Sequence, residues 1–455
     1  MASEWKEVQL QNIVSKLGDG LHGTPKYSED GNYYFINGNN LDDGNIVLKK
    51  DTKRVSFSEY EKHKKTLNNR TLLVSINGTI GNVAYYNNEP VILGKSACYF
   101  NLNENVSRCF VRYVLSSSAF RQYLESYSTG TTIKNVSLKM MRKFSFTLPP
   151  LPEQKAIAHI LGSLDDKIEL NRRMNATLEG MAQALFKSWF VDFDPVIDNA
   201  LSAGNPIPEE LSEHADVRRK ALADGTANRE AAKQFPAAFQ LTEEMGWIPE
   251  GWAAMTLNQA IQINPSVKLS KGTVAPFADM KALPTDGYSI KGVIKKAYSG
   301  GAKFHNDDVL LARITPCLEN GKTGIVDFLP SPSSVGFGST EFIVLRGKGD
   351  LSLPYVACLS REENFRLHCI QSMVGSSGRQ RVQNACFDSF YVACTTDLVV
   401  LKKFSEITQP MFQKVTEQSK ESHTLTRLRD TLLPKLISGE LRIPEAKKLT
   451  EEVLA

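Results

Sequence analysis

The chain has 455 residues and a formal net charge of +4, from 54 Lys and Arg against 50 Asp and Glu. This length exceeds what one hydrophobic core usually supports and predicts two or three folding units. The 42% hydrophobic and 23% charged residues are typical of a soluble globular protein and argue against a disordered chain. The sequence has no apolar run of membrane-spanning length, and its first residues, MASEWKEVQLQN, are too acidic and polar for a signal peptide. We expect a cytoplasmic protein.

The cysteines and the distribution of charge further limit the kind of protein this can be. The seven cysteines include no C-x-x-C pair, so reduced, mostly buried thiols are expected rather than a zinc site or a disulfide framework. Residues 1–150 carry 19 basic and 13 acidic groups, whereas residues 191–246 carry 5 and 11. A modestly basic globule suits a polyanionic partner, although a solvated surface has the same composition.

Residues 1–150 are expected to form a mixed globule of strands and helices. The segment RTLLVSINGTIGNVAYY predicts a buried strand, a glycine-containing turn and a second strand. The segment FVRYVLSSSAFRQYLESYSTGTTIKNVS follows and predicts an amphipathic helix that leads into a Gly/Ser/Thr loop.

Residues 151–191 are expected to form one long helix with a coiled-coil seam. Positions at heptad spacing are mostly apolar, and they are Ile157, Leu161, Leu164, Ile168, Asn171, Asn175, Leu178, Ala182, Leu185 and Trp189. If residues 153–190 are one helix, its length is about 57 Å at ~1.5 Å per residue.

Asn171 and Asn175 interrupt this seam where Leu or Ile would bind more tightly. A buried amide is paired in only one alignment of two helices, so it costs stability and selects register and orientation. The alternative is that both residues lie at a solvent-facing interruption.

The second half of the chain repeats the first at an offset of 247 residues. Trp5 corresponds to Trp252, and Leu10 to Leu257. After an acidic connector at 192–246, a second globule is expected at 247–401, a second helix at 402–440 and a C-terminal tail at 441–455. The second seam consists of Met411, Val415, Gln418, Ser422, Leu425 and Leu432. We expect Pro410 to limit where this helix begins and Pro434 to end or bend it near Leu433.

These elements predict an α+β protein in which the two helices pack on each other through their seams, with pseudo-twofold symmetry. A spacer of this length exceeds one turn of duplex DNA, about 34 Å. Two basic globules on a rigid spacer therefore fit a target of two separated half-sites.

No catalytic or metal-binding motif stands out. The run GDGLHG at residues 18–23 lacks the strand and helix of a nucleotide-binding loop. The seven histidines have no metal-ligand spacing. The chain is expected to recognise a target without catalysing a reaction.

Three stretches resemble one known family, the specificity subunits of Type I restriction-modification systems. They are LPPLPEQKAIAHILGSLDDKIELNRRMNATLEGMAQALFKSWFVDFDP, WIPEGW and the closing TLLPKLISGELRI. The resemblance covers nearly the whole chain. It implies two target recognition domains that are joined by two conserved helices in an antiparallel coiled coil and read a bipartite DNA sequence. It also implies two S-adenosylmethionine-dependent adenine methyltransferase subunits and two ATP- and magnesium-dependent restriction subunits as partners. No cofactor is implied on this chain itself.

Candidate DNA-binding residues lie in polar loops of each globule, where side chains can reach base edges and phosphates. For the first globule they are Ser75, Asn77, Thr79, Gly130, Thr131, Thr132 and Lys134. For the second they are Arg313, Thr315, Ser376, Ser377, Gly378, Arg379, Gln380 and Arg381.

Two other functions stay open at this stage. A coiled-coil adaptor whose globules bind proteins would not be retained on duplex DNA with a steep salt dependence. A self-sufficient methyltransferase or nuclease is disfavoured by the missing motifs, and cofactor binding by the isolated chain would support it.

Overall fold

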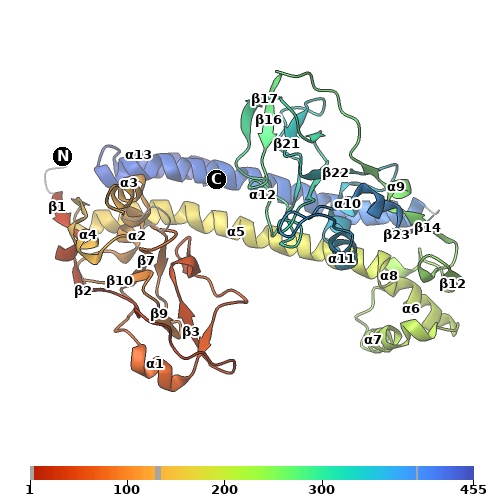
Figure 1. Ribbon diagram of the computed structural model, residues 1–455, viewed down its shortest axis with the longest axis horizontal. Helices are drawn as coiled ribbons and strands as arrows, with labels where there is room; N and C mark the ends of the chain where they lie inside the picture. The colour runs from red at the N-terminus through yellow and green to blue at the C-terminus, as the bar shows by residue number, and fades with distance from the viewer. Residues whose placement is uncertain (1–4, 129–134, 396–397, 455) are drawn as a thin grey trace. The chain divides into compact units, whose positions relative to one another are not determined.

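The computed structural model describes residues 5–128, 135–395 and 398–454. The chain divides into two compact units (Figure 1). Unit 1 comprises Met1–Glu169 and Ser422–Ala455, and unit 2 comprises Leu170–Glu421. The long helices α5 (Leu151–Phe190) and α12 (Leu398–Ser438) each have one end in unit 1 and the other end in unit 2. Within the described residues, no helix is long and apolar enough to cross a membrane.

The described part of unit 1 contains two small sheets and two two-stranded ribbons. The main sheet has the order β2-β10-β7-β8, the second has the order β6-β3-β9, and the ribbons pair β1 with β11 and β4 with β5. The strands are β1 (Lys6–Gln9), β2 (Val14–Asp19), β3 (Tyr33–Ile36), β4 (Leu41–Asp42), β5 (Asn45–Ile46), β6 (Arg54–Val55), β7 (Thr71–Ser75), β8 (Val83–Tyr85), β9 (Val91–Leu93), β10 (Ala97–Leu102) and β11 (Ser145–Leu148).

Four helices of unit 1 begin at serine caps, which are Ser56, Ser107, Ser117 and Ser137. Ser107, for example, accepts a hydrogen bond from the amide of Phe110 and satisfies a donor that the first helical turn leaves unpaired. The helices are α1 (Phe57–His63), α2 (Arg108–Ser116), α3 (Ser118–Tyr127), α4 (Leu138–Lys143) and α13 (Ile443–Leu454). The segment expected as a tail therefore forms a helix, and its Ala446 is buried in the core of this unit.

Unit 2 repeats this plan in residues 252–395, the second module, which corresponds to residues 6–148 of unit 1, the first module. Its main sheet has the order β15-β22-β19-β20, its second sheet has the order β17-β16-β21-β18, and β14 pairs with β23. The strands are β14 (Trp252–Thr256), β15 (Gln262–Ile263), β16 (Val274–Ala278), β17 (Ile294–Ala297), β18 (Lys303–Phe304), β19 (Val309–Ala312), β20 (Thr323–Ile325), β21 (Gly336–Gly338), β22 (Phe342–Arg346) and β23 (Tyr391–Thr395). The helices of this module are α9 (Leu257–Ala260), α10 (Leu353–Ser360) and α11 (Glu363–Gln371).

The matching strand orders confirm the predicted duplication. In each second sheet, one pair of neighbouring strands is parallel, β3 with β9 and β16 with β21. Parallel pairing between strands far apart in the sequence is not imposed by short turns. Its recurrence shows that the two modules share a topology although their letters have diverged.

The acidic connector is folded rather than extended. It forms α6 (Asp194–Ala203), α7 (Ser212–Ala223), α8 (Arg229–Ala232), β12 (Phe239–Thr242) and β13 (Gly246–Pro249), which follow α5 in Figure 1. Asp198 accepts two hydrogen bonds from the guanidinium of Arg218. The ring of Phe235 packs against Trp189 of α5 with ring centroids 5.1 Å apart. The connector is thus part of the core of unit 2.

Helices α5 and α12 pack together as in a coiled coil, as the seam predicts. Their 40 and 41 residues correspond to about 60 Å each at ~1.5 Å per residue. Ten of the predicted seam positions are buried: Ile157, Leu161, Leu164, Asn171, Ala182, Trp189, Val415, Gln418, Leu425 and Leu432. The others, Ile168, Asn175, Leu178, Leu185, Met411 and Ser422, are partly exposed.

The two seam asparagines make cross-helix contacts inside unit 2. Asn171 is 1% exposed, and its side-chain nitrogen lies 2.8 Å from a carboxylate oxygen of Glu421. The same nitrogen lies 3.5 Å from the carbonyl oxygen of Gln418, the residue 247 positions later. Asn175 donates to the hydroxyl of Ser419 at 3.2 Å. The amides are therefore paired across the seam, and the solvent-facing alternative is wrong for Asn171.

A partly buried ionic cluster joins the same two helices in unit 1. Asp165 of α5 lies 2.7 Å from Arg429 of α12 and 2.7 Å from Arg112 of α2, and it also accepts from the hydroxyl of Tyr113. Burial alone would raise the pKa of Asp165, but these three donors outweigh it and hold that pKa below its usual value. The cluster fixes α12 against the first module.

The expectation that Pro410 limits where the second helix begins is wrong, and Pro434 does not end this helix. Helix α12 begins at Leu398, twelve residues before Pro410, and continues past Pro434 to Ser438. A proline inside a helix removes one hydrogen bond and costs about 3 kcal/mol or more. Fully burying a large apolar side chain contributes about 1.5–3 kcal/mol, and several such side chains flank the prolines: Phe404, Phe412, Leu432 and Leu436.

Candidate nucleic-acid interface

In the second module, the residues predicted at 376–381 lie in a hairpin loop between α11 and β23. Val374 and Arg381 form its closing bridge. Gly375 and Gly378 have φ of 139° and 75°, which a side chain would disfavour. The amide of Arg379 donates to the carbonyl of Ser376 at 2.9 Å and forms a tight turn. Ser376, Ser377, Gly378 and Arg379 are exposed at its tip.

The structure brings this hairpin against the end of β19, where the other predicted residues lie. The amide of Thr315 donates to the carbonyl of Gln380 at 3.0 Å, and the amide of Val382 donates to the carbonyl of Arg313 at 2.9 Å. The guanidinium of Arg313 also donates to the carbonyl of Val382. Two segments about 65 residues apart in the sequence thus form one loop cluster.

The two arginines of the hairpin differ in what they contact. Arg381 forms a bidentate pair with Glu341, with nitrogen–oxygen distances of 2.8–3.0 Å. The hydrogen bond to this carboxylate raises the pKa of Arg381. The side chain of Arg381 is 42% exposed. Because it is paired with Glu341, Arg381 supports the hairpin and would have to leave Glu341 to contact a base. Arg379 is exposed at the tip and is the better placed of the two for an external partner.

In the first module, the predicted residues after β7 form the corresponding loop. The buried hydroxyl of Ser75 donates to the carbonyl of Thr79 and accepts from the amide of Asn82. Ser75 therefore shapes the loop from inside and is shielded from an external partner. Asn77 is partly exposed and Thr79 is exposed. Gly130, Thr131, Thr132 and Lys134 lie outside the described residues.

The backbone frame of this loop is the same in both modules. In the first, the amide of Val136 donates to the carbonyl of Ile76, and the amide of Ile76 donates to the carbonyl of Ser96. In the second, the amide of Val382 donates to Arg313, and the amide of Arg313 donates to Glu341. Ser96 and Glu341 are thus equivalent positions, and so are Ile76 and Arg313. One frame holds different side chains in the two modules.

The role of Glu341 could not be found from the sequence, because a carboxylate 40 residues from Arg381 gives no local signal. Aligning the main sheets of the two modules strand by strand, rather than by letters, would have placed Glu341 opposite Ser96. The contact of Glu341 with Arg381 matters for the site, because it leaves Arg379 as the arginine of the hairpin that is available to an external partner.

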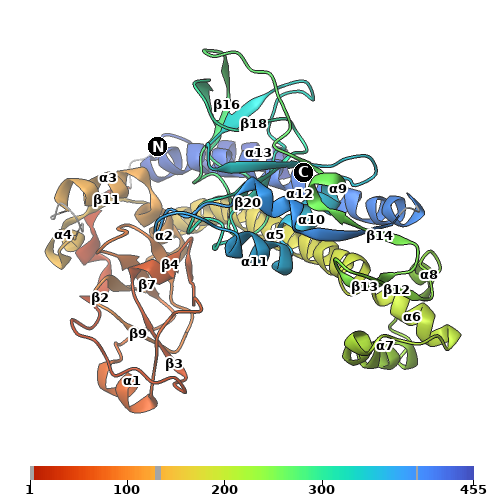
Figure 2. The ribbon, with the colours of Figure 1, turned by 45° about the vertical axis from the view of Figure 1, so that its right-hand side comes forward.

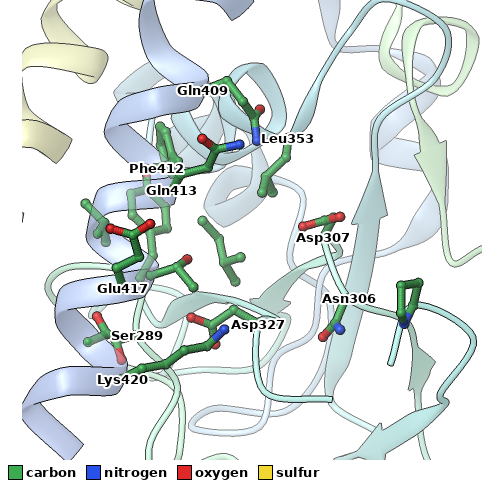
Figure 3. Close-up of a pocket in the computed structure, with 16 residues that line it drawn as sticks. Ser289, Asn306, Asp307, Asp327, Leu353, Gln409, Phe412, Gln413, Glu417 and Lys420 are labelled. Atoms are coloured by element: carbon green, nitrogen blue, oxygen red, sulfur yellow. The ribbon is translucent and has the colours of Figure 1, made fainter. Parts of the chain in front are cut away.

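A separate cavity of about 520 Å³ lies between α12 and the second module (Figure 3). Its wall includes Asp307, Asp327 and Glu417, the amides Gln409 and Gln413, and Lys420. Burial, and then the neighbouring Asp308, raises the pKa of Asp307. Carboxylates and amides in this proportion do not suit a phosphate group. Within the described residues, no group of three His, Cys, Asp or Glu side chains is arranged to hold a metal ion.

The comparisons with known proteins agree with this geometry. Residues 2–180 match the family model of the Type I restriction modification DNA specificity domain. The Type I restriction enzyme MjaIX specificity subunit of Methanocaldococcus jannaschii is 23% identical over 378 residues, which cover 82% of this chain and 78% of the relative. The HindI specificity subunit of Haemophilus influenzae is 25% identical over 360 residues, which cover 73% and 77%.

A solved S subunit of a Type I restriction-modification system from M. genitalium has the same fold. It is 17% identical, with a TM-score of 0.51 over 95% of this chain and 96% of that one. The duplicated modules and paired helices define a specificity-subunit fold. The chain is thus similar to Type I restriction-modification specificity subunits in sequence and in fold.

Proposed function

We propose that this chain reads a bipartite, asymmetric duplex DNA sequence, with one half-site for each module. The observation that carries this proposal is the shared loop frame with different side chains. A common frame places each loop alike, while the partly exposed Asn77 and exposed Thr79 in one module and the exposed Ser376 and Arg379 in the other offer different hydrogen-bonding groups. Base edges are distinguished by such differences in donors and acceptors.

The chain would act within a complex of two adenine methyltransferase subunits and two restriction subunits. In this proposal S-adenosylmethionine, ATP and Mg²⁺ belong to those partners, and this chain is not catalytic. A surface feature of α5 supports protein docking: Leu170, Met174 and Met181 are 50%, 39% and 52% exposed. Their spacing of four and seven places them on one stripe of the helix. Methionine adapts well to a partner surface.

Two arginine variants test the DNA-reading role. Arg379→Ala is expected to weaken binding to the cognate duplex by about 1–3 kcal/mol and to relax preference at one position of one half-site, because a bidentate base contact is lost. Arg381→Ala and Glu341→Gln should instead resemble one another, since both break the pair that supports the hairpin. The measurement is fluorescence anisotropy with the duplex and its single-base variants.

The dependence of binding on DNA sequence and on salt separates base reading from phosphate binding. If Arg379→Ala weakens binding equally for all sequences and makes the salt dependence shallower, Arg379 contacts phosphate. If no duplex binds the wild-type chain in a salt-dependent way, alone or with its methyltransferase partners, the protein-binding adaptor becomes the better description.

A further inference from the structure

The second sheet of each module carries a basic residue that lies over an aromatic ring. In the first module, the guanidinium carbon of Arg54 on β6 lies 5.5 Å from the ring centre of Tyr34 on β3. In the second, the amine of Lys296 on β17 lies 4.6 Å from the ring centre of Phe277 on β16. Strands β6 and β17 occupy the same place, since each is outermost in the order and antiparallel to its neighbour.

The second module extends this feature across the sheet. Phe337 of β21 packs against both Phe277 and Tyr298, with ring centroids 5.0 and 5.1 Å apart. The amine of Lys303 on β18 lies 6.0 Å from the ring centre of Tyr298. Lys296 and Lys303 thus stand at the two ends of an aromatic row. Figure 2 shows β16 and β18 together in this sheet.

The surroundings of both sheets are basic. Residues 264–304 contain seven lysines and two aspartates, and residues 45–70 contain eight Lys and Arg against three acidic residues. Arg54 and Lys296 are exposed. No ion pair within the described parts of the chain engages Arg54, Lys296 or Lys303. Their charge is available to an external anion.

Each sheet also leads to the recognition loop of its own module. In the second module, Ala302, which precedes Lys303, pairs with Gly338, and the chain continues from there to Glu341. In the first module, β3 ends at Ile36, and two residues later the amide of Gly38 donates to the hydroxyl of Ser96 at 2.8 Å. A strand of DNA whose bases meet the loop would have backbone phosphates within reach of the same sheet.

We propose that Arg54 in the first module, and Lys296 with Lys303 in the second, bind the phosphate backbone of the DNA. This inference rests on the proposed function and assigns its sequence-independent part. An aromatic ring beneath a cation restricts the side chain before binding, which lowers the entropy lost when a phosphate is held. The recurrence of the pair in two diverged modules favours this role over simple protection of a sheet edge, for which any exposed lysine suffices.

The test uses the full chain and a random-sequence 40-base-pair duplex, with affinity measured by anisotropy between 50 and 300 mM salt. The variants are Arg54→Gln, Lys296→Gln with Lys303→Gln, and all three together. Each phosphate contact contributes about 0.9 to the slope of log affinity against log salt. We expect slopes shallower by ~0.9, ~1.8 and ~2.7, and about 8-fold weaker binding per contact at 0.1 M salt. Lys447→Gln with Lys448→Gln on α13, both exposed, is the matched control for the pair.

The outcomes separate the two proposals. A shallower slope in the variants, an unchanged slope in the α13 control, and a normal slope in Lys296→Arg with Lys303→Arg support the phosphate role. The slope does not depend on the fraction of folded protein, so a poorly folding variant does not mimic this result. Equal slopes in the variants, the control and the wild type overturn the phosphate role and leave sheet-edge protection. A wild-type chain without salt-dependent binding, both alone and with the methyltransferase subunits, overturns the proposed function as well.

Discussion

Inserting four residues into both long helices, after Glu169 and after Glu421, is expected to lengthen the unspecified spacer of the DNA target by one or two base pairs. Both positions lie at the boundary of the two units, so the contacts within each unit are kept, including that of Asn171 with Glu421. Four residues add about 6 Å of helix and turn it by ~40° beyond one full turn. One base pair adds about 3.4 Å and ~34° to the duplex.

The length and rotation added to the helices are similar to those added by one or two base pairs of duplex. Each module can therefore meet its half-site again after a small shift along the DNA. Inserting two residues at the same positions rotates the two parts of each seam by about 200° relative to one another. That variant should lose assembly and methylation altogether. A methylation motif unchanged by the four-residue insertions would show that the helices do not set the spacing.

Replacing Ala253–Cys394 by the corresponding segment of a related specificity subunit is expected to change one half of the target and leave the other half and the spacer intact. The boundaries follow from β14 and β23, which are paired so that Ala253 lies opposite Cys394. The graft therefore enters and leaves the structure at adjacent points. Trp252, which packs against Phe190 of α5, stays in place.

The reciprocal exchange is the control. Strands β1 and β11 pair Glu7 with Thr147 in the same way, so replacing residues 7–147 should change only the other half of the target. The readout is the motif of methylated adenines in cells that carry each hybrid with the methyltransferase subunits. A hybrid in which both halves change together would contradict independent reading by the two modules.

The duplication and the helix pair could be predicted because they rest on periodicity. Heptad spacing identifies buried positions such as Leu161 and Leu425 whatever the tertiary context. The offset of 247 residues even places Asn171 opposite Gln418. Pattern reasoning failed at Pro410, because a local rule about proline does not include the burial of Phe404 and Phe412 nearby.

The candidate loops could be located from the sequence, but the burial and the hydrogen-bond partners of their side chains could not be predicted. Composition identified the Arg379 hairpin and the end of β19, which the structure joins through Thr315 and Gln380. The burial of Ser75 and the pairing of Arg381 with Glu341 depend on contacts between distant segments. The aromatic-backed cations also escaped the sequence, since Arg54 and Tyr34 meet only through strand pairing.

Mapping methylated adenines across the genome of a host that contains this chain, the methyltransferase subunits proposed as its partners and no other adenine methyltransferase tests the central claim most directly. Two modules with one frame and different loops predict a single motif of two short, unlike blocks of specified bases separated by a spacer of fixed length. A continuous motif without a spacer, or two identical blocks, would contradict the account.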